Sequence, residues 1–401
     1  CGFIEPARAE SLGELKTLAA AKRRGQKLVA AGCLAELDPH MLLAEVPGLD
    51  GVLGTRRWHE LPKLLPCLDA GAQPPVWVGD SNRPSPQPRR FPAGATAYVK
   101  IAEGCSGPCA FCTIPRIKGP YRSRSREEVI AEVVDLVGRG YKEVILVAQD
   151  TTAYGRDRGE RDGLPALVEG ILDRCPELPW LRLMYTYPQH VSERLVELMG
   201  SRSQVCRYVD LPLQHAHPAA LRRMHRPADV DAILRLIERL RKAMPDVALR
   251  TAFIVGYPGE TEEEFEALLR FVRAVRFDHV GAFAYSPEPG TPAHEMGPRL
   301  PEEVKEERRA RLLQEQQAIS LEINRSLVGE RFEVLVEGKG DGMSVGRTYR
   351  DAPEVDGLAL LTEECEPGRF VCGRVMQAME YDLLLEPVPT TESAETRVRN
   401  G

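Results

Sequence analysis

The sequence lacks long hydrophobic runs, a surplus of basic residues and the cysteine density of a disulfide-stapled protein. The longest apolar run, residues 28–35, has eight residues, whereas a membrane-spanning helix needs ~18 or more. Ten cysteines among 401 residues are too few for a disulfide scaffold. With 53 basic and 59 acidic residues the formal charge is −6, which argues against a general nucleic-acid binder. We therefore expect a cytoplasmic protein without a membrane partner, whose clustered cysteines bind metal or carry redox chemistry.

Residues 1–72 alternate between helical and strand-like segments, a pattern typical of a small parallel α/β sheet. Helices are expected at 6–24, 39–46 and 57–68, and strands at 27–31 and 50–53. The first strand of such a sheet would precede Cys1, so we interpret this domain as truncated at its start. Residues 73–93 follow as a proline-rich linker.

Residues 94–300 form a second and longer α/β series. Six strands are expected, at 97–101, 143–148, 181–185, 208–211, 248–255 and 280–284. Helical patterns lie between them, at 126–137, 164–174, 192–199, 230–243 and 262–275. Strands joined by helical crossovers are parallel, either in an open sheet or curled into a partial barrel. In both arrangements the chemistry is expected at the carboxyl ends of the strands.

The last part of the chain changes character. Residues 301–325 read as one charged connecting helix, and 326–389 are rich in β-branched residues and glycine turns. That composition predicts a small antiparallel β-barrel, with strands at 331–337, 358–361, 371–376 and 381–386. Residues 390–401 form a tail.

Three cysteines follow the first strand of the middle region closely. Cys105, Cys109 and Cys112 have the spacing C-x3-C-x2-C. Three thiolates leave one iron of a 4Fe-4S cluster without a protein ligand, and an open metal position is where a substrate coordinates. A structural zinc site is the alternative, but it needs four closed ligands, and no fourth Cys or His lies nearby in the sequence.

This loop, with Phe111 before its last cysteine, resembles the signature of the radical S-adenosylmethionine (SAM) superfamily. The resemblance implies a partial (β/α)6 barrel in which the cluster cleaves SAM to a 5′-deoxyadenosyl radical. The rest of the chain is similar to the methylthiotransferase family, which has an N-terminal α/β domain and a C-terminal TRAM β-barrel. No catalytic acid or base is required beyond the cluster ligands, because the cofactor supplies the chemistry.

The family resemblance also implies a second, auxiliary 4Fe-4S cluster. The segments C-G-F-I-E-P-A at 1–7 and A-G-C-L-A at 31–35 resemble two of the family's three N-terminal cysteine motifs. Cys1 and Cys33 are therefore expected to be ligands, with buried core cysteines as the alternative. The third ligand would precede Cys1, so we expect this cluster to be incomplete in the chain.

Within the family, three motifs resemble the members that modify a protein more than those that modify tRNA. They are F-C-T-I-P-R-I-K-G-P-Y-R-S-R at 111–124, A-Q-D-T-T-A-Y-G at 148–155 and D-L-P-L-Q-H-A at 210–216. The implied reaction adds a methylthio group to the β-carbon of an aspartate in small-subunit ribosomal protein S-twelve, with an electron donor as a second partner. Methylthiolation of a tRNA adenosine and a non-catalytic ribosome-associated iron–sulfur protein remain the alternatives.

Further residues are candidates for holding SAM. The family resemblance places Phe111, Gln149 and Asp150 near SAM, and polar groups such as those of Gln149 and Asp150 suit its ammonium. Asp210 ends the fourth strand of the barrel and could reach a polar group of SAM. Gly256 lets the backbone approach a ligand closely, and the family resemblance implies that this segment lies near the adenine. Each also has a structural explanation: a helix cap for Asp150, a turn for Asp210, and a strand-to-helix turn for Gly256.

Charge bears on the choice of substrate. Residues 326–389 contain thirteen acidic and six basic residues, a formal charge of −7. Such a barrel repels a phosphate backbone and attracts a basic protein, so tRNA is an unexpected partner. A basic run (Lys118, Arg122, Arg124, Arg126) lies just past the cysteines and is either a solvated face or a patch that neutralises an acidic ligand.

Overall fold

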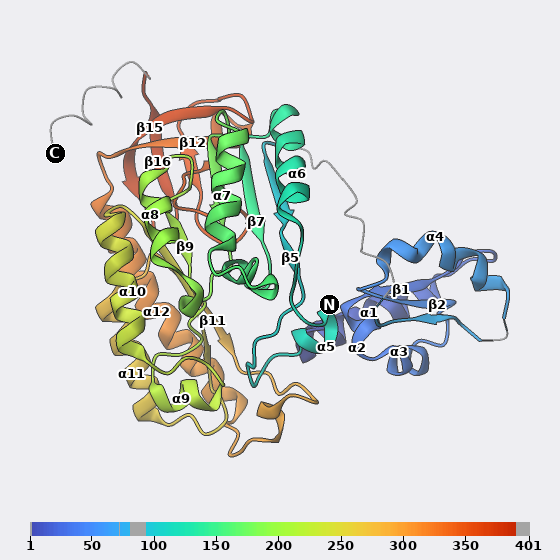
Figure 1. Ribbon diagram of the computed structural model, residues 1–401. Helices are drawn as coiled ribbons and strands as arrows, with labels where there is room; N and C mark the ends of the chain where they lie inside the picture. The colour runs from blue at the N-terminus through green and yellow to red at the C-terminus, as the bar shows by residue number, and fades with distance from the viewer. Residues whose placement is uncertain (1, 72, 81–93, 390–401) are drawn as a thin grey trace.

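The computed structural model describes residues 2–71, 73–80 and 94–389. Its N-terminal domain is a three-stranded parallel sheet in the order β1-β2-β3, drawn in blue in Figure 1. The domain contains α1 (Glu5–Ala20), β1 (Val29–Gly32), α2 (Cys33–Leu37), α3 (Pro39–Glu45), β2 (Gly51–Gly54), α4 (Leu61–Leu64) and β3 (Val76–Trp77).

Two expectations for this domain need correction. The helix expected at 57–68 is broken into the short α4 between two 3₁₀ turns, because Pro62 and Pro66 lack the N–H groups that a continuous helix uses. Strand β3 lies within the stretch interpreted as a linker and pairs with β2. The proline at 75 precedes this strand and does not interrupt it, since proline is tolerated where a strand begins.

The middle region forms the predicted partial barrel of six parallel strands. The strands are β4 (Thr96–Lys100), β7 (Glu143–Val147), β8 (Trp180–Leu183), β9 (Tyr208–Asp210), β10 (Ala248–Val255) and β11 (His279–Ala284). They form two halves, β4-β7-β8 and β9-β10-β11, joined by a parallel bridge between Leu181 and Val205. The predicted partial barrel is therefore confirmed.

Helices cover the outside of this sheet (Figure 1). They are α6 (Arg126–Gly138), α7 (Gly163–Arg174), α8 (Glu193–Ser201), α10 (Val230–Ala243) and α11 (Glu262–Val275), while the short α9 (Pro218–Arg223) lies at the end of the core where the strands end. Four begin at a side-chain cap that the sequence marks, namely Ser125, Ser192, Asp229 and Thr261. Thr261 forms a full capping box with Glu264.

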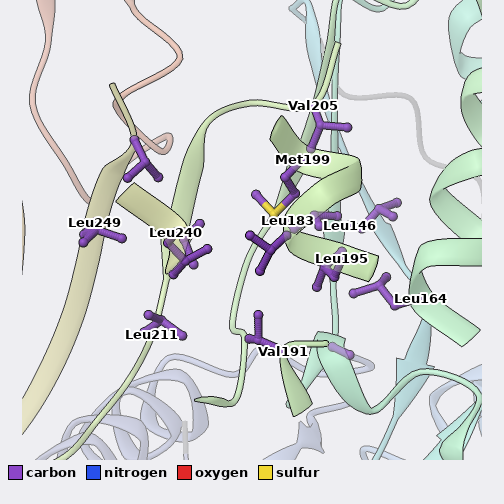
Figure 2. Close-up of a cluster of buried hydrophobic side chains, with 14 of the residues drawn as sticks. Leu146, Leu164, Leu183, Val191, Leu195, Met199, Val205, Leu211, Leu240 and Leu249 are labelled. Carbon is purple, nitrogen blue, oxygen red and sulfur yellow. The ribbon is translucent and has the colours of Figure 1, made fainter. Parts of the chain in front are cut away.

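The core lies between the sheet and these helices. Alternate strand residues such as Leu146, Leu183 and Leu249 point to the helices and are fully buried. Figure 2 shows them meeting Leu195 and Leu240 from the helical layer. Because successive residues of a strand point to opposite faces, the residues between these leucines face the inside of the barrel. Within the described residues, no helix combines the length and apolar composition needed to cross a bilayer.

Helix α12 (Glu302–Ser326) leads to the C-terminal barrel. Five strands close in the order β12-β13-β14-β16-β15, which confirms the predicted barrel. They are β12 (Arg331–Gly340), β13 (Met343–Arg347), β14 (Ala359–Leu361), β15 (Phe370–Ala378) and β16 (Leu383–Pro387). Strand β13 was not expected, and the β14–β16 pair is parallel, so the barrel is not purely antiparallel.

The C-terminal barrel packs against one end of the partial barrel (Figure 1). Trp180 and Tyr208 of the core share a hydrophobic cluster with Leu335 and Ala352 of the C-terminal barrel. Buried charges reinforce this contact: Glu143 on β7 binds both Arg182 on β8, at 2.7 Å, and Arg347 on β13, at 2.6 Å. The C-terminal barrel thus closes the end of the partial barrel that lies opposite the carboxyl ends of its strands.

Candidate functional site

The three predicted cluster cysteines lie on one loop, at the carboxyl end of β4. The loop runs from β5 (Ala102–Glu103) to α5 (Ile114–Lys118), and each thiol is free and half-buried. A Cβ on Gly107 would stand 3.3 Å from the sulfur of Cys105 and 3.9 Å from that of Cys109. The sulfurs of Cys105 and Cys109 therefore both lie next to Gly107, and a side chain there would crowd the sulfur of Cys105.

Hydrogen bonds hold the ends of this loop. The amide of Cys105 donates to the carbonyl of Gly119 at 3.0 Å, and the amide of Ala110 donates to the carbonyl of Met224, also at 3.0 Å. Strand β5 pairs with β6 (Arg122–Ser123). Gly104 has a φ of +75°, and a Cβ there would stand 2.1 Å from the carbonyl oxygen of Pro120. Only glycine fits this entry to the loop.

The thiols suit a positively charged group. Burial raises the pKa of Cys105, and it raises the pKa of Cys112 to about 12. Neighbouring cysteines raise both further, while amide N–H groups of Gly107 and Ile114 donate to the two sulfurs at 3.3 and 3.4 Å. Each thiolate raises the pKa of the neighbouring thiols, and a bound cation offsets this repulsion between negative charges. The three cysteines therefore fit a cluster. Among the described residues, no three His, Cys, Asp or Glu side chains surround a single metal position.

The two predicted SAM contacts after β7 differ in whether their side chains are free to bind a ligand. Gln149 follows β7 and its side chain is exposed, whereas the carboxylate of Asp150 is occupied. One oxygen of Asp150 accepts hydrogen bonds from the Thr152 hydroxyl at 2.6 Å and the Ala153 amide at 3.0 Å, and the other lies 2.8 Å from Nδ1 of His190. Asp150 therefore caps the turn after β7, as its structural explanation required.

Asp210 and Gly256 also have structural partners. Asp210 is fully buried, its two oxygens bound by Arg250 at 3.0 Å and by the amide of Tyr185 at 3.2 Å. Burial raises its pKa, and Arg250 opposes that rise. Gly256 has a φ of +71°, and a Cβ there would stand 2.1 Å from Cγ of Lys305 on α12. The close approach at this glycine is thus with a helix of the chain itself. Contact of either residue with SAM stays a prediction.

Phe111 and the basic run are built into the scaffold around the loop. The ring of Phe111 meets the edge of Tyr257, with centroids 6.5 Å apart. Lys118 donates to the Thr55 hydroxyl of the N-terminal domain at 2.9 Å, and Arg124 binds Glu132 at 2.7 Å. Arg126 binds Glu160 at 2.6 Å. Three side chains of the run are therefore held by partners within the chain, whereas Arg122 is exposed and pairs only with the exposed Asp80.

Cys33 is the first residue of α2, and this helix packs against α5, which follows the cluster loop. Gly2 lies against the same turn, since a Cβ there would stand 2.7 Å from the amide nitrogen of Leu34. Cys1 lies outside the described residues. One turn after Cys33, the buried Glu36 binds Arg56 at 2.7 Å and accepts from the Gly79 amide at 2.8 Å.

Sequence reasoning missed three side chains beside the cysteine loop. Nη1 of Arg226 lies 3.7 Å from the sulfur of Cys109, and its guanidinium stacks over the ring of Tyr187. That ring in turn neighbours His190, the partner of Asp150. These residues come from loops after α9 and β8 and show no spacing relative to the cysteines, so no sequence signal marks them.

Comparison with known proteins agrees with this geometry. Residues 99–272 match the Radical SAM superfamily and residues 328–388 match the TRAM domain. The ribosomal protein uS12 methylthiotransferase RimO of Chloroflexus aurantiacus is 46% identical, over 96% of this chain and 89% of its own length. The RimO of Roseiflexus castenholzii is 44% identical, over 100% of this chain and 89% of its own. The chain belongs to the RimO family of radical SAM methylthiotransferases.

The fold has a more distant counterpart among solved structures. The radical SAM methyltransferase TsrM of Kitasatospora setae superposes with a TM-score of 0.54 at 16% identity, covering 83% of this chain and 63% of that one. At that identity the likeness shows the fold alone. Membership of the RimO family thus rests on the sequence relatives, and it makes this chain a radical SAM enzyme with a TRAM barrel.

Proposed function

We propose that this chain methylthiolates the β-carbon of an aspartate in ribosomal protein uS12. The observation that carries the proposal is the similarity to uS12 methylthiotransferases along nearly the whole chain. The three-cysteine loop at the carboxyl end of β4 supports it, because that edge of a parallel barrel is where active sites form.

Cys105, Cys109 and Cys112 would hold the 4Fe-4S cluster, leaving one iron open for SAM. When bound, these cofactors supply radical abstraction of hydrogen from an unactivated carbon. The chain itself fixes the loop through Gly104 and the paired strands β5 and β6. Gln149, exposed beside the site, would contribute to binding SAM, while Asp150 holds His190 in place.

Cys33, with Cys1, would serve the auxiliary cluster that the family resemblance implies. The half-buried thiol of Cys33 and the cluster loop belong to elements that contact each other, because α2 packs against α5. A second cluster at this contact would lie on the same side of the core as the first.

The charge of the C-terminal barrel supports a protein substrate. Its formal charge of −7 counts Arg347, Arg350, Asp351 and Asp356, all of which are buried against the core. Removing two arginines and two aspartates leaves the charge unchanged, so the outer surface carries the whole excess. A basic ribosomal protein is attracted to such a surface, whereas an RNA backbone is repelled.

The test is anaerobic reconstitution with iron and sulfide, incubation with SAM and with dithionite as the electron donor, and mass spectrometry of uS12 and of unmodified tRNA. We expect a methylthio group on an aspartate of uS12, and no change in tRNA. A Cys105→Ala/Cys109→Ala/Cys112→Ala variant should form no 5′-deoxyadenosine, and a Cys67→Ala/Cys365→Ala variant should behave as wild type. Modified tRNA with unmodified uS12 would move the chain to the tRNA reaction. A wild-type chain that forms no 5′-deoxyadenosine would indicate a non-catalytic iron–sulfur protein.

A further inference from the structure

Arg226 brings a permanent positive charge to one cysteine of the cluster loop. Its Nη1 lies 3.7 Å from the sulfur of Cys109, although the two residues are 117 positions apart in the sequence. The guanidinium cannot lose its proton in a protein. Arg226 therefore places a positive charge beside Cys109.

Two contacts fix the orientation of this guanidinium. Nη2 donates to the carbonyl of Pro212 at 2.5 Å, and the carbon Cζ lies 4.2 Å from the centroid of the Tyr187 ring. The backbone amide of Arg226 donates to Leu221 at 2.8 Å. The ring covers one face of the guanidinium and excludes water from it. An ionic interaction is stronger where water is excluded.

We propose that Arg226 is a positioning residue that raises the reduction potential of the cluster. The inference rests on the proposed role of Cys109 as a cluster ligand. On reduction, the cluster accepts one electron from a donor such as dithionite, and no bond forms or breaks. A fixed cation beside a ligand sulfur stabilises the added negative charge, because hydrogen bonds and net charge at the sulfurs set such potentials.

The experiment is a redox titration of the reconstituted chain with dithionite, followed by electron paramagnetic resonance. Arg226→Gln should shift the midpoint to a more negative potential. Arg226→Lys should shift it less in the same direction, because lysine keeps the charge but loses the planar, stacked geometry. Arg222→Gln removes an exposed arginine from α9 and should leave the midpoint unchanged. An Arg226→Gln midpoint equal to that of wild type would overturn the proposal.

Tyr187 gives a second and milder test. Tyr187→Phe keeps the ring face and should titrate as wild type, whereas Tyr187→Leu should shift the midpoint in the direction of Arg226→Gln. If Arg226→Gln does not retain a cluster, Arg226→Lys and Tyr187→Leu decide the matter, and wild-type midpoints in both would refute the inference. Failure of the wild-type chain to bind a cluster would refute the proposed site instead.

Discussion

The N-terminal domain and the C-terminal barrel are both joined to the core by charged residues, but they bury these charges differently. On the N-terminal side, Arg122 and Asp80 form an ion pair whose side chains are 63% and 51% exposed. On the C-terminal side, Glu143, Arg182 and Arg347 are at most 1% exposed. An exposed pair contributes about 0–1 kcal/mol, whereas a buried group is costly to leave without its partner. The buried charges of Glu143, Arg182 and Arg347 thus fix the orientation of the C-terminal barrel on the core.

The two junctions differ in their apolar contacts as well. The ring of Trp180 in the core meets Phe370 of the C-terminal barrel edge-on, with centroids 4.8 Å apart. Within the described residues, the hydrophobic clusters of the N-terminal domain contain only its own side chains. Its junction with the core is therefore polar. The comparison shows that the C-terminal barrel shares a hydrophobic core with the middle region. The N-terminal domain is joined to the middle region by a few polar contacts.

Loss of the buried anion should break the C-terminal junction most severely. Glu143→Gln leaves the guanidinium groups of Arg182 and Arg347 buried without their shared carboxylate. We expect the free energy of unfolding to fall by about 3–5 kcal/mol, measured by urea titration and circular dichroism. A loss below about 1 kcal/mol would contradict the comparison.

The same carboxylate predicts a dependence on pH. Burial alone would raise the pKa of Glu143, but Arg182 and Arg347 outweigh it and hold that pKa below its ordinary 4.5. A lowered pKa contributes stability that is present above pH 4.5 and is lost as the pH falls through the folded-state value. The difference in melting temperature between wild type and Glu143→Gln should therefore become smaller as the pH is lowered from about 7 to about 3, because Glu143 becomes protonated in this range. A constant difference would show that ionisation of Glu143 is not responsible.

One buried contact at the N-terminal junction should have an intermediate effect. The carboxylate of Glu288 is 2% exposed, pairs with Arg8 and accepts from the amide of Glu5 at 3.0 Å. Glu288→Ala leaves these donors without an acceptor, so we expect a loss of about 1–3 kcal/mol in the free energy of unfolding. Ser286→Ala, which removes only a hydroxyl bound to the same carboxylate, is the matched control and should cost less.

The exposed pair should matter least. Arg122→Gln removes one of the two arginines that pair with Asp80, the other being Arg56 at 3.0 Å. We expect the free energy of unfolding to change by less than about 1 kcal/mol because solvent screens the charges of Arg122 and Asp80. Melting temperatures at low and high salt would check this. A loss as large as that of Glu288→Ala would mean that the N-terminal junction depends on this pair.

Much of the fold was predictable because its signals are local. Strand β10 and helices α10 and α11 begin and end where the sequence pattern placed them, since alternation and helical period are read from consecutive residues. The strands β3 and β13 were missed. Strand β3 has only two residues and pairs with β2, whereas β13 is held between β12 and β14.

In the candidate site too, some residues could be predicted from sequence and others could not. The cysteine spacing identified the loop, because the three cysteines lie within eight residues of sequence. The uses of Asp150 and Asp210 could not be chosen from sequence, because each depends on a partner from a distant element, His190 in one case and Arg250 in the other. A carboxylate at the end of a strand has the same local sequence whether it binds a ligand or a neighbouring side chain.

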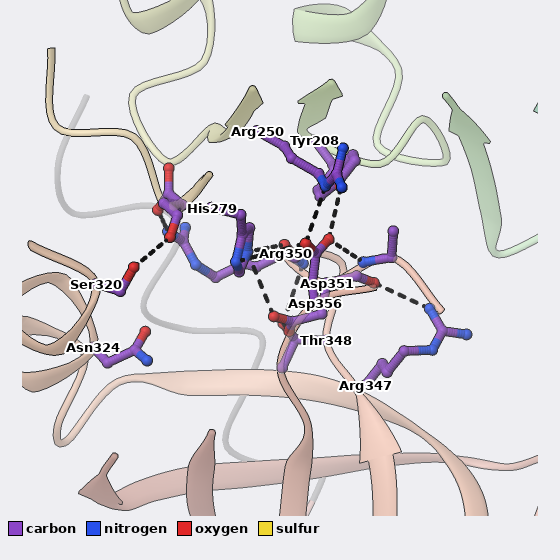
Figure 3. A network of polar contacts seen from close by, with 12 residues as sticks. Tyr208, Arg250, His279, Ser320, Asn324, Arg347, Thr348, Arg350, Asp351 and Asp356 are labelled. Carbon is purple, nitrogen blue, oxygen red and sulfur yellow. Dashed lines mark hydrogen bonds and ion pairs between the residues drawn. The ribbon is translucent and has the colours of Figure 1, made fainter. Parts of the chain in front are cut away.

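The sequence by itself determined the family, the cysteine loop and the order of the longer helices and of most strands. Only the tertiary structure decided that Asp356 of the C-terminal barrel binds Tyr208 and Arg250 of the core, where the two barrels meet (Figure 3). It also brought Arg226 to Cys109. The physical reason is that spacing and periodicity act over a few residues, while these contacts form between segments that only the packed core brings together.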